Sequence, residues 1–243
     1  MTGPDEFLAD PGHRVQIGRY LSDTVHVWSI DAVGRPPIVA DLATMLDDDE
    51  RRRADALLCA DDRRRFLVTH GAVRILVGLH LGAPPDQIRW QYGPHGKPEL
   101  AGAWTGVRVS LSHSGDRALL ALTDRRAVGV DVEALPRDRA AVRLAARFFP
   151  DAEARFVAAG RRGEKADRFA RLWVRKEACV KAAGARLVQG LPLPVHGSEV
   201  VAVGSAADRY LVRDLVVAPD CRAAVAVAGA SSFHLVRHSW APR

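Results

Sequence analysis

The stretch AVGVDVE, residues 127–133, decides the fold of this 243-residue chain, because it predicts a strand on which two acidic side chains lie together. Its β-branched residues are typical of strands. Residues two apart in a strand point to the same face, so Asp131 and Glu133 project together while Val130 and Val132 pack behind them. Two neighbouring carboxylates repel each other unless a cation or a proton intervenes. Mg²⁺ held by carboxylates and substrate phosphates would remove this repulsion. The alternative is the solvated outer face of an edge strand.

A long helix is predicted downstream, where residues 164–184 read EKADRFARLWVRKEACVKAAG. Residues four apart lie along one stripe of a helix, and one such stripe consists of Phe169, Trp173, Glu177 and Lys181. An ordinary amphipathic helix keeps its apolar face apolar, whereas this stripe changes from aromatic to carboxylate to ammonium. A Glu–Lys ion pair along the helix is the alternative interpretation. If the helix crosses the 127–133 strand, three carboxylates and one lysine converge, which suits Mg²⁺ and phosphate chemistry.

The predicted elements fall into two groups, each with a strand, helical segments and further strands. The first group contains a strand at 24–30, a helix at 63–81 and strands at 107–112 and 118–123. The second contains the 127–133 strand, helices at 139–147, 152–159 and 164–183, and strands at 199–203, 210–217, 223–228 and 233–236. This order predicts an α+β fold of two similar α/β half-domains, residues 1–126 and 127–243, related by pseudo-two-fold symmetry.

The charge balance indicates an anionic partner. The formal net charge is +6 and the pI is near 9.7. The basic residues are 31 arginines and four lysines, namely Lys97, Lys165, Lys176 and Lys181. Because arginine dominates so strongly, each lysine is a candidate for a position that requires a compact ammonium group. The arginine triplets at 51–53 and 63–65 form no basic stripe, since residues 47–65 contain seven acidic residues and six arginines. Nucleic-acid binding is therefore disfavoured.

Secretion and membrane insertion are not indicated. No apolar run approaches the roughly 20 residues of a membrane span, and residues 1–10 lack the basic and apolar regions of a signal peptide. The three cysteines, Cys59, Cys179 and Cys221, lie far apart and form no CxxC motif. We therefore expect neither a disulfide framework nor a zinc site, and we expect a cytoplasmic protein with no membrane partner.

Two shorter motifs bear polar side chains on strand ends or turns. The segment SLSHSG at 110–115 places Ser112 and His113 before a glycine turn. Adjacent strand residues point to opposite faces, so these two side chains do not form a hydrolase pair, and the chain has no GxSxG motif. A serine and a histidine in this position suit contacts to an anion. The turn GKP at 96–98 presents Lys97, with a plain surface turn as the alternative.

Together these segments resemble the 4′-phosphopantetheinyl transferases, in their long single-chain, Sfp-like branch. The matching motifs are GVDVE at 129–133, FARLWVRKEACVKAAG at 169–184, SLSHSG at 110–115, GKP at 96–98 and the helix RRFLVTHGAVRILVG at 64–78. The resemblance covers residues 64–193, and the pair GVDVE and WxxKEAxxKxxG is its most specific part.

The resemblance implies two similar halves with coenzyme A in the cleft between them. The implied reaction moves the phosphopantetheine arm of coenzyme A, the co-substrate, to a serine of an apo acyl or peptidyl carrier protein, and releases adenosine 3′,5′-bisphosphate. Displacement at phosphorus needs alignment and charge neutralisation rather than a covalent protein nucleophile. The implied partner is an acidic carrier protein, and a monomer is expected because both halves of the cleft lie on one chain.

The same resemblance assigns a metal site and catalytic residues. Asp131, Glu133 and Glu177 would bind Mg²⁺ against the pyrophosphate of coenzyme A. Glu177 would also help to deprotonate the carrier serine, directly or through water. Lys181 would stabilise the charge that develops on the leaving phosphate.

A second set of residues would bind coenzyme A itself. Ser112 and His113 would contact its phosphates, and Lys97 and Arg74 would hold its adenosine end. Related sequences often bind the 3′-phosphate through lysines before the first helix. The corresponding positions here are Cys59 and Asp62, so the alternatives are Arg63, Arg64 and the arginines at 51–53.

Two other classes remain as alternatives on the sequence alone. One is a different Mg²⁺-dependent nucleotide or phosphoryl enzyme that uses the same carboxylates, although the chain has no P-loop or glycine-rich phosphate loop. The other is a nucleic-acid-binding module that uses the arginines.

Overall fold

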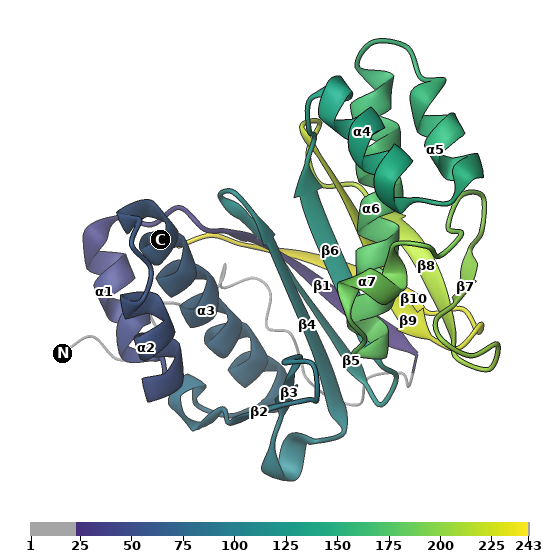
Figure 1. Cartoon of the computed structure of the whole chain (residues 1–243). Coiled ribbons are helices and arrows are strands. Elements are labelled where there is room, and N and C mark those ends of the chain that lie inside the picture. Colours follow the sequence, from purple (N-terminus) through teal and green to yellow (C-terminus); the bar gives the residue numbers. More distant parts are fainter. Residues whose placement is uncertain (1–22, 243) are drawn as a thin grey trace.

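Two four-stranded sheets share an apolar layer, and helices cover the outer face of each sheet (Figure 1). The structure is a computed structural model that describes residues 23–242. Residues 1–10, in which the sequence indicates no signal peptide, lie outside this range. Within the described range, no helix has the length and apolar character needed to cross a membrane.

The first sheet has the strand order β10-β1-β5-β4. Its strands are β1 (Thr24–Asp31), β4 (Val107–Ser114), β5 (Arg117–Asp124) and β10 (His234–Trp240). The C-terminal strand β10 pairs with β1 in parallel, whereas the other neighbours are antiparallel. The remaining elements of this part are α1 (Pro36–Thr44), α2 (Asp48–Asp55), α3 (Ala60–Leu81), η2 (Pro85–Gln87), β2 (Trp90–Tyr92), β3 (Pro98–Leu100) and η3 (Gly102–Trp104). Figure 1 shows α1, α2 and α3 together on one side of this sheet.

The second sheet is antiparallel, with the strand order β6-β9-β8-β7. Its strands are β6 (Val128–Ala134), β7 (Val200–Ala202), β8 (Arg209–Leu215) and β9 (Cys221–Ala228). Its helices are α4 (Asp138–Phe148), α5 (Asp151–Ala158), α6 (Glu164–Ala183) and α7 (Leu187–Gly190). Helix α6 lies directly against β6 and β9.

The alternation of side chains along β6 places its acidic residues toward the helices. Val130 and Val132 pack with Val25 of β1 in the apolar layer between the two sheets. Because successive strand residues point to opposite faces, Asp131 and Glu133 lie on the side of α6. The strand predicted from AVGVDVE thus has one apolar face and one acidic face, as its sequence indicates.

The α+β class of the fold is confirmed, and the two long predicted helices are present as α3 and α6. Helices α1 and α2 were not predicted. Helix α2 forms within the charged run because Asp47 and Glu50 make a capping box, in which each side chain accepts a hydrogen bond from the backbone N–H of the other. The boundary at 126 between half-domains stays a prediction.

One glycine allows α6 to reach β6. A Cβ atom on Gly129 would lie 2.0 Å from the carbonyl oxygen of Ala178 and 2.4 Å from the backbone nitrogen of Ala182. Both are backbone atoms of a helix, which cannot move aside as a flexible side chain could. The first residue of the GVDVE motif is therefore glycine because helix and strand pack backbone against backbone.

We expect Gly129→Ala to lower the free energy of unfolding by about 3 kcal/mol, because the added methyl group forces α6 away from β6. Urea unfolding followed by circular dichroism measures the change. Gly106→Ala is the matched control, since a Cβ there meets no atom within 4 Å. Equal stability of the two variants would contradict the backbone-to-backbone packing.

Candidate active site

The candidate site lies where α6 crosses β6. Asp131 is only 2% exposed, and its Oδ1 accepts two hydrogen bonds of 2.7 Å, one from Lys181 Nζ and one from the Ser112 hydroxyl. Its Oδ2 is buried and has no hydrogen-bond partner among residues 23–242. A buried carboxylate oxygen without a partner costs free energy. This oxygen therefore indicates a position for a cation or a proton.

Two more carboxylates interact electrostatically with Asp131. Burial, followed by the charge of Asp131, raises the pKa of Glu133 above its ordinary value. Burial and then the charge of Asp131 also raise the pKa of Glu177 from 4.5 to about 7, although the Lys181 ammonium opposes this shift. The charge of Asp131 thus disfavours the ionisation of both glutamates, whereas the Lys181 ammonium favours it.

These carboxylates are hard oxygen ligands of the kind that Mg²⁺ binds. In the part of the chain that the structure describes, no three His, Cys, Asp or Glu side chains have the geometry of a metal site as they stand. The orphaned Oδ2 of Asp131 and the mutual repulsion of the carboxylates nevertheless fit a divalent cation, which would relieve both. Asp131, Glu133 and Glu177 are the residues that could hold it.

The SLSHSG motif contributes two residues with different surroundings. The Ser112 hydroxyl donates to Asp131 and accepts the backbone N–H of Val132 at 3.4 Å. Because this buried hydroxyl is already engaged, we no longer assign it to the phosphates of coenzyme A. His113 is exposed, yet partial burial of its ring and the nearby Lys181 charge lower its pKa. Its side chain remains available for an anion.

A cavity of about 530 Å³ opens beside His113, between α3, the β2–β3 hairpin and β4. Apolar side chains such as Phe66 and Tyr92 line much of it, and so do Gly96 and Pro98 of the GKP motif. A mostly apolar pocket of this size with a few polar groups is typical of sites for small organic molecules.

The side chain of Lys97 caps helix α6 instead of lining this cavity. Its Nζ donates to the carbonyl oxygens of Val128 at 3.1 Å and Ala182 at 3.4 Å. Ala182 lies in the last turn of α6, where carbonyl groups lack partners within the helix. Burial lowers the pKa of Lys97 to about 8. The expected contact of this side chain with the adenosine end is therefore replaced by a structural role.

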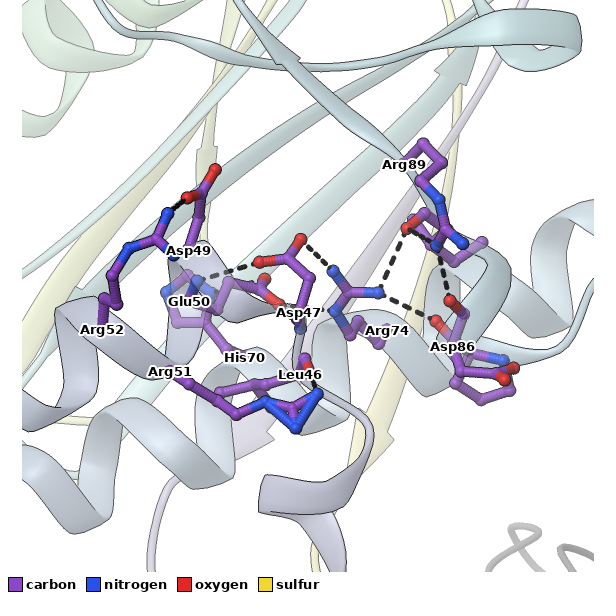
Figure 2. Close-up of polar contacts among 12 residues, drawn as sticks. Leu46, Asp47, Asp49, Glu50, Arg51, Arg52, His70, Arg74, Asp86 and Arg89 are labelled. Carbon is purple, nitrogen blue, oxygen red and sulfur yellow. Dashed lines mark hydrogen bonds and ion pairs between the residues drawn. The ribbon is translucent and has the colours of Figure 1, made fainter.

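Arg74 of α3 is also absent from the candidate site, because its side chain is fully buried and is not among the residues that line the cavity. Figure 2 shows its guanidinium beside Asp47 and Glu50, the two acidic residues of the α2 capping box. Its Nε and Nη2 lie 2.5 Å from Glu50 and Asp47, and its Nη1 donates to the carbonyl oxygens of Pro85 and Ile88 at 3.1 Å. With every nitrogen engaged inside the protein, Arg74 is no longer assigned to coenzyme A.

We expect Arg74→Ala to lower the free energy of unfolding by about 3–5 kcal/mol, because it leaves the buried Glu50 carboxylate without its main partner. Denaturant unfolding measures this loss. The control is Arg52→Ala, which removes an exposed ion pair with Asp49 in the same region and changes stability far less (Figure 2). A stable Arg74→Ala protein with weakened coenzyme A binding would restore the original assignment.

Two features near the candidate site were not predicted from the sequence, namely the start of α2 and the row of serines on β4. The D-x-x-E spacing at 47–50 is a capping-box signal that would have revealed the start of α2. The serines at 110, 112 and 114 recur with a period of two, which places them on one face of a strand. Ser114 accordingly contacts Glu133, with its hydroxyl 3.4 Å from Oε2.

Comparison with known proteins gives a consistent family. The model of the 4′-phosphopantetheinyl transferase superfamily matches residues 127–208, which include β6 and α6. The 4′-phosphopantetheinyl transferase HetI of Nostoc sp. is 34% identical over 213 residues, 86% of this chain and 90% of HetI. A putative 4′-phosphopantetheinyl transferase of Synechocystis sp. is 31% identical over 64% of this chain and 63% of its own length. The transferase Sfp of Bacillus subtilis is 26% identical over 65% of this chain and 66% of Sfp.

The chain therefore belongs to the 4′-phosphopantetheinyl transferase superfamily. It is an enzyme of the transferase class, and its general reaction is the transfer of a 4′-phosphopantetheinyl group. The resemblance seen in the sequence motifs is confirmed at the level of the superfamily.

Proposed function

We propose that this transferase moves the 4′-phosphopantetheine arm of coenzyme A to a serine hydroxyl of an apo acyl or peptidyl carrier protein, with Mg²⁺ as cofactor. The serine oxygen forms a bond to the phosphorus that carries the pantetheine arm, and the P–O bond to the adenosine phosphate breaks. The serine proton passes to a base, and adenosine 3′,5′-bisphosphate leaves. The proposal rests on the electrostatic coupling of Asp131, Glu133, Glu177 and Lys181 at the crossing of β6 and α6.

Asp131, Glu133 and Glu177 would hold Mg²⁺, which when bound would neutralise charge on the pyrophosphate. Without Mg²⁺, these carboxylates repel an anionic substrate as well as one another. The buried, unpartnered Oδ2 of Asp131 supports this assignment most directly.

Glu177 is suited to accept the proton of the carrier serine, directly or through water. A general base works best when its pKa lies near the working pH, and the pKa of Glu177 is raised to about 7. An unperturbed glutamate would be fully ionised at neutral pH but would be a much weaker base. The raised value therefore favours catalysis near neutrality.

Lys181 would stabilise the negative charge on the leaving phosphate. Its bond to Asp131 Oδ1 fixes the direction of the ammonium group, and about 29% of the side chain remains exposed. A preoriented positive charge stabilises a developing anion without the cost of reorganisation. The compact ammonium also explains why lysine stands here in a chain rich in arginine.

The adenosine end of coenzyme A would occupy the 530 Å³ cavity, with His113 toward its phosphates. Among the arginines at 51–53, 63 and 64, it is Arg53 that lines this cavity. Arg63 and Arg64 instead pair with Asp55 and Asp61 on the surface. We therefore favour Arg53 as the ligand of the 3′-phosphate.

An acidic carrier protein fits the net charge of +6. Arg139 and Arg143 of α4 line a surface depression together with Arg162 and Lys165, and α4 follows β6 directly in the chain. We also propose that the enzyme acts as a monomer, since β6 and α6, which carry the candidate site, belong to one chain. A cytoplasmic location is proposed because Cys59, Cys179 and Cys221 are free thiols.

We expect an apo carrier protein incubated with the enzyme, coenzyme A and Mg²⁺ to gain the mass of phosphopantetheine, measured by intact-protein mass spectrometry.

Glu177→Gln should slow this transfer at least about 100-fold, because an amide cannot accept the serine proton. Glu164→Gln, an exposed position on the same helix, is the control and should retain wild-type rates. No mass gain across acyl and peptidyl carriers would overturn the proposed function.

We expect kcat/KM to rise with pH through the ionisation of Glu177. Without a bound cation the pKa of Glu177 is about 7, so roughly one tenth of this carboxyl is ionised at pH 6, and at low Mg²⁺ the rate falls as the pH drops below 7. A nearby cation favours the ionised form, and the midpoint should therefore move to lower pH as Mg²⁺ is raised. A profile that is flat from pH 5.5 to 8 at every Mg²⁺ concentration would exclude Glu177 as the base.

A further inference from the structure

The two sheets meet along strands β4 and β6, a junction that we call the seam. Side chains rather than backbone pairs connect the two strands there. β4 is an edge strand of the first sheet and β6 is an edge strand of the second. Within the described residues, β4 pairs with β5 alone and β6 with β9 alone. Backbone N–H groups on an edge strand need partners when they are buried.

Three serines of β4 provide these partners, and we call them the serine ladder. Their hydroxyl oxygens accept the backbone N–H groups of alternate residues on β6. The pairs are Val130 to Ser110 at 3.0 Å, Val132 to Ser112 at 3.4 Å and Ala134 to Ser114 at 3.0 Å. The serines recur with a period of two, and so do the N–H groups of β6 that they bind, at residues 130, 132 and 134.

The three serines of the ladder differ in the acceptor to which their hydroxyl hydrogen is donated. A hydroxyl that accepts an N–H still has one hydrogen to donate. Ser112 donates it to Oδ1 of Asp131 at 2.7 Å, and Ser114 lies 3.4 Å from Oε2 of Glu133. Ser110 makes the backbone contact and has no carboxylate partner among the described residues.

We propose that Ser112 is a positioning residue that orients Asp131 for metal binding. Together with Lys181, it holds Oδ1 and so leaves Oδ2 as the free oxygen of a buried carboxylate. The same hydroxyl binds the N–H of Val132, so the register of the seam and the direction of the carboxylate are set by one side chain. This proposal rests on the proposed function, because the metal is the cofactor assigned there.

The competing explanation is that the serine ladder has a purely structural role. A comparison with Ser110 distinguishes this structural role from the positioning role of Ser112. Ser110 and Ser112 are both buried, at 4% and 6% exposure, and each accepts one N–H from β6. Replacing either by alanine removes one contact across the seam. Only the change at Ser112 also removes a donor to Asp131.

The test compares Ser112→Ala with Ser110→Ala in Mn²⁺ titrations of the full chain, followed by electron paramagnetic resonance. Mn²⁺ is the probe because it binds the same oxygen ligands as Mg²⁺. We expect Ser112→Ala to raise the Mn²⁺ dissociation constant at least about tenfold, as loss of a group that orients a metal ligand typically does, and Ser110→Ala to change it less than about twofold. Ser112→Thr, which keeps a hydroxyl, should restore tighter binding.

Equal Mn²⁺ affinities for the two alanine variants, or no Mn²⁺ binding by the wild-type chain, would overturn the proposal. Thermal unfolding of both variants shows whether a loss of affinity reflects a loss of fold. If the wild-type chain transfers no phosphopantetheine while its Mn²⁺ binding depends on Ser112, the proposed function fails and the positioning role stands. If the wild-type chain transfers phosphopantetheine normally but the two alanine variants bind Mn²⁺ equally well, the positioning role fails and the proposed function stands.

Discussion

Helix α6 rests on β6 with backbone against backbone, and the arrangement of the three carboxylates and Lys181 depends on this contact. The absence of a side chain at Gly129 brings the helix close enough for Lys181 to reach Asp131. The same approach removes water from the carboxylates, which is the largest cause of the raised pKa of Glu177. A packing distance therefore sets the electrostatics of the site, because both the charge contacts and the desolvation follow from it.

Two kinds of interaction hold the halves of the molecule together. The apolar layer between the sheets supplies burial, which is favourable but not directional. The serine ladder and the contact of Lys97 with the end of α6 are directional, since each requires a donor and an acceptor at a fixed spacing. Polar contacts across the seam thus fix the alignment of β4, β6 and α6, on which the position of the carboxylates depends.

The sequence predicted the parts of this arrangement that follow from local periodicity. Strand β6 with its acidic face can be predicted from residue spacing, and so can helix α6 with Glu177 and Lys181 on one stripe and the α+β class. The surroundings of Arg74 and Lys97 could not be read in this way, because a motif indicates a residue type but not the direction of its side chain. Arg74 donates a hydrogen bond to Glu50, which lies twenty-four positions earlier in the chain. Glu50 is held in place by a capping box that was not recognised within the charged run.

Strand β10, near the end of the chain, lies beside β1, which begins at residue 24. During synthesis on the ribosome, β1 therefore lacks its outer neighbour until the chain has been made as far as β10, more than 200 residues later. Until then its edge is open to water or to another chain. The first half cannot reach its final form while the second is being translated, and a cut between them would divide a sheet rather than separate two units.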